Sequence, residues 1–124
     1  MHSKLEKRLK SEVGIVADRI ANIISSVRMA KHMRSVYSLR YQGNIGRKIE
    51  IYDRSHAVGK TLEIYISLKN GESTSIEVTA FLGAECQGID VTILRLLSEN
   101  LLRTGYQRIT EYDKSFYRKE IQVN

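Results

Sequence analysis

Several residue types and patterns are missing from this chain of 124 residues. It contains no Pro and no Trp, and Cys86 is its single cysteine. One cysteine excludes an intramolecular disulfide and is typical of a reducing compartment. No apolar run approaches the roughly 20 residues that span a bilayer, and the N-terminus lacks the charged, apolar and small-residue order of a signal peptide. We therefore expect a cytoplasmic protein with no membrane partner.

The motifs of common enzyme classes are also missing. No Walker loop, dinucleotide-binding Gly motif or hydrolase nucleophile elbow occurs, and Asn44–Lys48 lacks the Gly spacing and the Ser or Thr of a phosphate loop. The three histidines, His2, His32 and His56, show no metal-site spacing, which disfavours a zinc site that joins His32 and His56 to Cys86. The sequence therefore predicts no cofactor and no metal, and favours a binding protein over an enzyme.

Charge is abundant and unevenly placed. The chain has 20 Lys and Arg against 14 Asp and Glu, a net charge of +6. Residues 1–60 carry 13 cations against 5 anions, a net +8, and residues 61–124 carry 7 against 9, a net −2. A basic half beside a slightly acidic half favours nucleic acid or an acidic protein surface as a partner. A positive balance is also common in proteins that bind no polyanion.

The first part of the chain is predicted to be one long helix from Ser3 to about Ser38, forming a basic arm over residues 1–40. Apolar residues recur there at alternating spacings of four and three: Leu9, Val13, Val16, Ile20, Ile23, Val27 and Ala30. This heptad seam is typical of a helix that buries one face. Its partner is either a second copy of the helix, giving a homodimer through residues 9–30, or the chain's own sheet.

The middle of the chain, residues 47–105, is predicted to be a sheet with a helix on it. Alternation of apolar and polar residues predicts three antiparallel strands, at Lys48–Asp53, Thr61–Leu68 and Ser73–Ala80. A three-residue loop ending at Gly71 would pair Ile66 with Thr74 and Ile64 with Ile76, which keeps the apolar residues of both strands on one face. The other face is polar, so we expect the sheet to be covered on one side.

A helix follows over Ile89–Thr104, with Asp90 as its N-cap and Gly105 after its last turn. Its apolar stripe is expected to pack on the apolar face of the sheet. The tail, residues 106–124, mixes aromatic and charged residues and fits a last strand, a short helix or a loose end. The whole chain is therefore predicted to be a single α+β domain over residues 1–124.

The second half carries a recognisable order of segments. LEIYISLKNGESTSIEV, FLGAEC, VTILRLLSENL and TEYDKSFY give a strand, a turn with Gly, a strand ending in an apolar-Gly-x-x-Cys element, a Leu-rich helix and an acidic, aromatic tail. In this order they resemble a family of short cyanobacterial and archaeal proteins, the domain of unknown function numbered 2997. The resemblance covers about residues 61–117, and its distinctive part is Gly83–Cys86. It implies a fold for this half and no activity.

The segment from Met33 to Lys48 places cations beside aromatic rings, the combination with which proteins bind phosphates and stack bases. With the basic face of the first helix, it gives the predicted nucleic-acid-binding residues: Lys7, Lys10, Arg28, Arg34, Tyr37, Arg40, Tyr41, Arg47 and Lys48. A structural interpretation is also open, because Tyr37 continues the helical seam and arginines near a helix end complement the helix dipole. The alternative function is a protein adaptor, or a small subunit of a larger complex, that docks through the heptad seam or the sheet edge.

A third function, thiol chemistry, rests on Cys86 alone. The residue comes shortly before a predicted helix, where the partial positive charge of the helix start lowers a thiol pKa. The neighbouring Glu85 opposes thiolate formation. We therefore favour a structural role for Cys86 as a small residue in the turn after Gly83.

Overall fold

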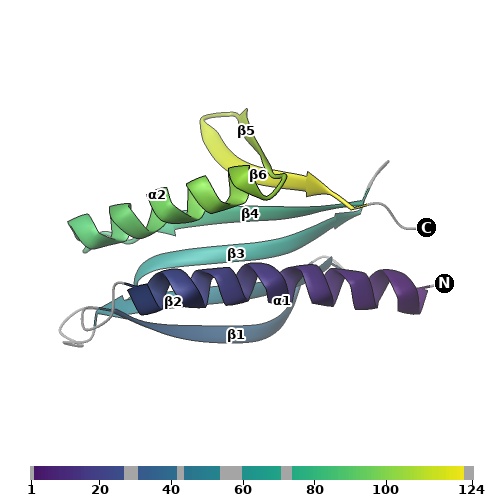
Figure 1. Ribbon diagram of the computed structural model, residues 1–124, viewed down its shortest axis with the longest axis horizontal. Coiled ribbons are helices and arrows are strands. Elements are labelled where there is room, and N and C mark those ends of the chain that lie inside the picture. The colour runs from purple at the N-terminus through teal and green to yellow at the C-terminus, as the bar shows by residue number, and fades with distance from the viewer. Residues whose placement is uncertain (1, 27–30, 42–43, 54–59, 71–73, 122–124) are drawn as a thin grey trace.

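The computed structural model describes residues 2–26, 31–41, 44–53, 60–70 and 74–121. This part of the chain is an α+β fold of two helices and a six-stranded antiparallel sheet (Figure 1). The helices are α1 (His2–Ser26) and α2 (Gly88–Arg103). The strands are β1 (Lys31–Tyr41), β2 (Asn44–Asp53), β3 (Lys60–Asn70), β4 (Thr74–Leu82), β5 (Gln107–Glu111) and β6 (Lys114–Glu120). Their order in the sheet is β1-β2-β3-β4-β6-β5, so that β6 lies between β4 and β5.

Both helices lie on the same face of the sheet, side by side (Figure 1). Their buried residues form one core with alternate residues of the strands, among them Ile49, Ile64 and Ile76. The other face carries the polar residues of β2, β3 and β4, among them Glu50, Glu63 and Glu77, and no described helix lies on it. The prediction that the sheet is covered on one side is confirmed, and we call the two sides the helix-bearing face and the open face.

The seam of α1 packs against the chain's own sheet. Val13, Val16 and Ile20 are buried within the single chain, and α1 contacts β1, β2, β3 and β4 as well as α2. These side chains are therefore buried within the chain itself and are not available to pack against a second helix. The side chains of Leu9, Val27 and Ala30, the other members of the predicted seam, lie outside the described residues.

The predicted helix is wrong from Lys31 onward, because residues 31–41 form the strand β1; residues 27–30 lie outside the described residues. This strand pairs antiparallel with β2, from Lys31 opposite Asp53 to Tyr41 opposite Asn44. Its β-branched and aromatic residues suit a strand, and the pairing satisfies its backbone along one edge. The predicted helical arm over residues 1–40 is therefore a helix followed by a strand, and the three-stranded sheet is an underestimate.

The hairpin of β3 and β4 has a different register from the predicted one. Ile66 pairs with Val78, and Ile64 pairs with Ala80. The connection still has three residues, 71–73, but it starts two residues later than predicted, after the pair of Asn70 and Thr74. A shift by an even number of residues keeps the same side chains on the same face, so the apolar face was predicted correctly although the pairs were not.

The start of α2 is fixed by a buried carboxylate. Gln87 is the N-cap, and Asp90, predicted at that position, is instead the third residue of the helix. Its Oδ2 accepts a hydrogen bond from the Gln87 backbone N–H at 2.8 Å, and its Oδ1 accepts one from the Thr61 hydroxyl at 2.9 Å. Thr61 is the extra residue of a β-bulge, since Leu62 pairs with Ile51 while Lys60 pairs with Tyr52. The bulge thus joins β3 to the helix start.

The tail folds as the hairpin of β5 and β6, which is the strand option of the prediction. Its turn residues Tyr112 and Asp113 both have positive φ, 49° and 66°, as a two-residue hairpin turn requires. Just before β5, Gly105 follows the end of α2 with φ of 97°, as expected for the residue after a C-cap. The buried Tyr106 donates a hydrogen bond from its hydroxyl to Glu12 Oε1 at 3.2 Å, which links the hairpin to α1.

Candidate functional site

The predicted basic residues are divided between the two faces of the sheet. Arg47 and Lys48 are consecutive in β2, so they lie on opposite faces, with Arg47 on the side of the buried Ile49. Position 40 pairs with Ile45 and belongs to the helix-bearing face, whereas position 34 pairs with Glu50 and belongs to the open face. The cations of residues 33–48 are therefore not gathered on one surface.

The backbone positions of part of the predicted set fall toward one end of the molecule (Figure 1). The ends of β1 and β2 that meet at Tyr41 and Asn44 lie toward the N-terminal half of α1 (Figure 1), and α1 contacts both strands. Lys7 and its neighbour Arg8 are exposed on that half of α1. We call this region the cationic end and define it by Lys7, Arg8, Lys10, Arg40 and Arg47.

Some of the predicted site lies outside what the structure describes. Arg28 is outside the described residues, as are the side chains of Lys10, Arg34, Tyr37, Arg40 and Tyr41, whose backbone positions alone are known. Arg47 interacts with another group within the chain. Stacking of bases on Tyr37 and Tyr41 therefore stays a prediction.

Lys48 takes part in an ion-pair network on the open face. Glu50 and Glu63 lie directly opposite each other on β2 and β3, an arrangement that is destabilising for like charges. The Lys60 Nζ lies 3.1 Å from Glu50 Oε2 and 2.7 Å from Glu63 Oε1, and the Lys48 Nζ lies 3.7 and 3.5 Å from the Oε2 atoms of the same two residues. The two lysines thus neutralise two carboxylates, so Lys48 is less suited to hold a phosphate than we predicted.

Hydrogen bonds in and beside the network shift the pKa values of Glu63, Lys60 and Tyr65. Hydrogen bonds from Lys60 and from the Tyr65 hydroxyl lower the pKa of Glu63 to about 2, and bonds to Glu63 and Glu50 raise the pKa of Lys60. The Tyr65 hydroxyl donates to Glu63 Oε2 at 2.6 Å, which raises the pKa of Tyr65. Glu63 and Lys60 are therefore charged near neutral pH.

Two aromatic rings stand beside this network and were missed as a cluster in the sequence. Tyr65 and Phe81 meet edge to face with 5.7 Å between ring centroids, and the Lys48 Nζ lies 5.5 Å from the Tyr65 centroid. On the same face Arg118 forms two hydrogen bonds with Glu77 Oε2, at 2.9 and 2.7 Å. Since Lys48, Lys60 and Arg118 all have carboxylate partners, these three contribute little positive potential. The alternation of polar and apolar residues would have placed both rings on the polar face.

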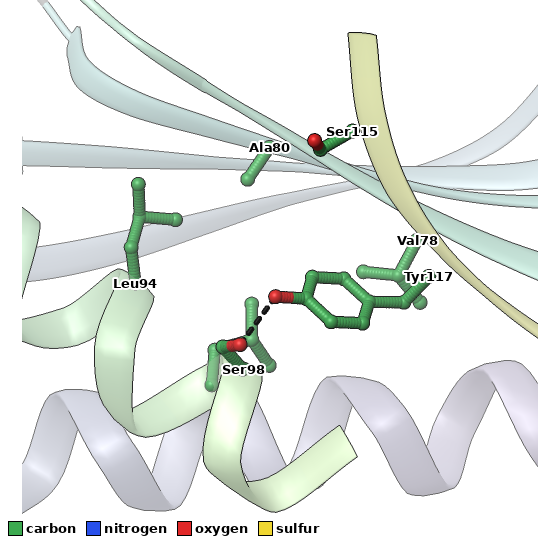
Figure 2. Close-up of a pocket in the computed structure, with 7 residues that line it drawn as sticks. Val78, Ala80, Leu94, Ser98, Ser115 and Tyr117 are labelled. Atoms are coloured by element: carbon green, nitrogen blue, oxygen red, sulfur yellow. Dashed lines mark hydrogen bonds between the residues drawn. The ribbon is translucent and has the colours of Figure 1, made fainter. Parts of the chain in front are cut away.

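A small cavity lies between α2 and the strands β4 and β6 (Figure 2). Its volume is about 150 Å³, and it is lined by Val78, Ala80, Leu94, Leu97, Ser98, Ser115 and Tyr117. The hydroxyls of Ser98 and Tyr117 point toward each other and form a hydrogen bond across it. Sites for small-molecule ligands usually measure about 300–1,000 Å³. This cavity therefore suits an apolar group of a few carbon atoms, and its lining includes no base beside a nucleophile.

Cys86 is exposed and not in a disulfide, and its backbone N–H donates to the Gly83 carbonyl at 3.1 Å within the turn before α2. The thiol is thus not packed in the turn, contrary to the structural interpretation.

In the described part of the chain, no group of three or more His, Cys, Asp or Glu residues is placed to hold a metal ion. His56 lies outside the described residues, as does the side chain of His32. No described helix is both long and apolar enough to span a bilayer.

Comparison with known proteins adds no further guide to function: no family model, no curated protein and no solved structure matches the chain. The resemblance of residues 61–117 to a family of unknown function stays a prediction.

Proposed function

We propose that this protein is a non-enzymatic binding protein whose ligand is nucleic acid, held at the cationic end. The observation that supports the proposal is the register of β1 and β2. It places positions 40 and 47 on the helix-bearing face, at the end of the sheet where Lys7 and Arg8 of α1 are exposed. Cations of three elements, α1, β1 and β2, thereby have backbone positions toward one end of the molecule (Figure 1).

The location of the remaining charge also favours a polyanion at this end. On the open face, Lys48, Lys60 and Arg118 have carboxylate partners. Of the net +8 in residues 1–60, α1 carries +2, from five cations and three carboxylates, and β1 carries +3, from three cations and no carboxylate. Neutralising phosphates releases condensed counterions, which supplies most of the affinity of sequence-independent nucleic-acid binding.

The test is the salt dependence of binding to a fluorescein-labelled oligothymidine of about 15 nucleotides, followed by anisotropy. Apart from Arg47, which interacts within the chain, the cationic end has four cations, and four contacts to phosphates of a single strand give a log-log slope of about −3. The double variant Lys7→Glu/Arg8→Glu should bring the slope to about −1.5, since two of the four contacts are lost.

A matched control separates location from net charge. Arg95 and Arg103 are exposed on α2, so Arg95→Glu/Arg103→Glu makes the same change in net charge away from the cationic end. This control should keep the slope of the unaltered protein. No binding to the oligothymidine at about 50 mM salt, where phosphate contacts are strongest, would refute the proposal. If both double variants weaken oligothymidine binding equally, the placement of the binding site at the cationic end is refuted.

A further inference from the structure

β1 forms one edge of the sheet, and no described strand pairs with its outer side. It has 11 residues, whereas strands usually have about 5–6. Natural edge strands are commonly blunted by short length, Pro, bulges or charge. β1 has a bulge between Val36 and Leu39, but from Lys31 to Val36 its pairing with β2 is unbroken. Lys31–Val36 is therefore a regular strand segment with one row of backbone hydrogen-bonding groups directed away from the sheet.

The charges of β1 select what can pair with it. The strand contains the cations Lys31, Arg34 and Arg40 and no Asp or Glu. A second copy of β1 would bring like charges side by side, which is destabilising across strands. The opposite edge of the sheet, β5, has one cation and one anion, Arg108 and Glu111. The positive charge of β1 thus disfavours pairing with a second copy of β1 and favours pairing with an acidic strand.

We infer that an extended acidic segment of a partner protein adds to β1 over Lys31–Val36 as a further strand of the sheet. Main-chain hydrogen bonds to the edge supply affinity, and carboxylates opposite the cations supply specificity and register. Position 31 pairs with Asp53 and position 34 with Glu50, so the two cations belong to opposite faces of the sheet. The partner segment is therefore expected to carry acidic residues three positions apart. This goes beyond the proposed nucleic-acid binding, because it uses the half of β1 remote from the cationic end.

The test uses a fluorescein-labelled peptide of about eight residues, made of Val, Thr and Glu with Glu at every third position. Two variants carry N-methyl groups on alternate backbone nitrogens, one on the odd and one on the even positions. Successive N–H groups of a strand point to opposite edges, so only one set can face β1. One variant should lose about tenfold or more in affinity, the equivalent of one or two hydrogen bonds, and the other should bind like the parent peptide.

Charge reversal on the protein gives the second arm. Arg34→Glu should weaken the acidic peptide about tenfold and strengthen a Lys counterpart of it. Arg108→Glu, the same change on the opposite edge, should leave both affinities unchanged. Arg34 is outside the cationic end, so oligothymidine binding should also be unchanged by Arg34→Glu, which keeps this inference separate from the proposed function.

Three outcomes overturn the inference. The first is no binding of the acidic peptide at low salt. The second is equal binding of both N-methylated variants, which shows attraction by charge without strand pairing. The third is loss of oligothymidine binding in Arg34→Glu while peptide binding is retained, which assigns the first half of β1 to nucleic acid instead.

Discussion

Replacing Thr61 by Val removes one hydroxyl group from the junction of β3 and α2 and keeps the shape of the side chain. Thr61 and Asp90 are both 0 % exposed, and the hydroxyl donates to Asp90 Oδ1 at 2.9 Å. Water cannot replace this donor without opening the junction. A hydrogen bond to a charged group contributes about 1.5–3 kcal/mol, and the loss of its donor leaves a buried acceptor with one partner fewer. We therefore expect Thr61→Val to lower the free energy of unfolding by about 2 kcal/mol.

The assay is urea unfolding followed by circular dichroism, with a thermal scan beside it. For a domain of this size, 2 kcal/mol corresponds to a decrease in Tm of about 6–10 °C. Thr110→Val is the matched control, because Thr110 is an exposed strand residue, and such changes usually stay within about 0.5 kcal/mol. If Thr61→Val lowers the free energy of unfolding no more than this control does, the hydrogen bond between Thr61 and Asp90 does not stabilise the junction of β3 and α2.

Three further predictions concern the open face, the seam and the turn before α2. The pKa of Glu63 is about 2 in the folded chain against an ordinary 4.5, so its contribution to stability is present above pH 4.5 and is lost as pH falls toward 2. The free energy of unfolding, measured in urea, should therefore decrease between pH 5 and pH 2.5 by about 1 kcal/mol less in Glu63→Gln than in the unaltered chain, after allowance for solvent screening. Ile20 is 1 % exposed in the core, so Ile20→Asp should be unfolded by circular dichroism, and a folded variant would contradict the burial of the seam. A Cβ on Gly83 would lie 2.7 Å from the Lys60 carbonyl oxygen, so Gly83→Ala should cost about 1–3 kcal/mol in urea unfolding, whereas Gly14→Ala, with open space in α1, should stabilise the chain by about 0.5–1 kcal/mol.

The parts of the fold that were predicted correctly are those with local signals. β3, β4 and α2 lie close to the expected ranges, because alternation marks a half-buried strand and a stripe of Leu and Ile marks a helix. Gly105 marked the end of α2 for a local reason as well, since its positive φ favours glycine. The number of strands and the register depended on contacts between distant segments, which alternation does not contain.

The error at residues 31–41 arose from two signals that conflict. The spacing of Ile23, Val27 and Ala30 continues the heptad pattern, so the helix was extended through the segment that follows. Val36, Tyr37 and Tyr41 favour a strand, and pairing with β2 decides in its favour. Arg34, Arg40 and Arg47 were predicted to bind nucleic acid together. Strand alternation separates them, so the predicted cluster shrank to the cationic end.

The ion pairs of the open face could be predicted only in part. Lys48, Glu50 and Glu63 were visible as polar members of two strands, but the bridging role of Lys60 depends on the bulge at Thr61, which sets where the lysine falls. A bulge adds one residue to one strand and leaves little trace in an alternating pattern.

The contacts of α1 with the last third of the chain bear on the speed of folding. Glu12 accepts hydrogen bonds from Tyr106 and Lys119, 94 and 107 residues later, and Arg19 donates to Thr104, 85 residues later. Folding rates fall as the mean sequence separation of contacts rises, because long loops must close before such contacts form. The polar side of α1 thus finds its partners only when the end of α2 and the hairpin after it are in place. We expect the hydrogen bonds of Glu12 to form late, so that a chain cut after α2 would lose them while β1–β4 and α2 still cover the apolar seam of α1.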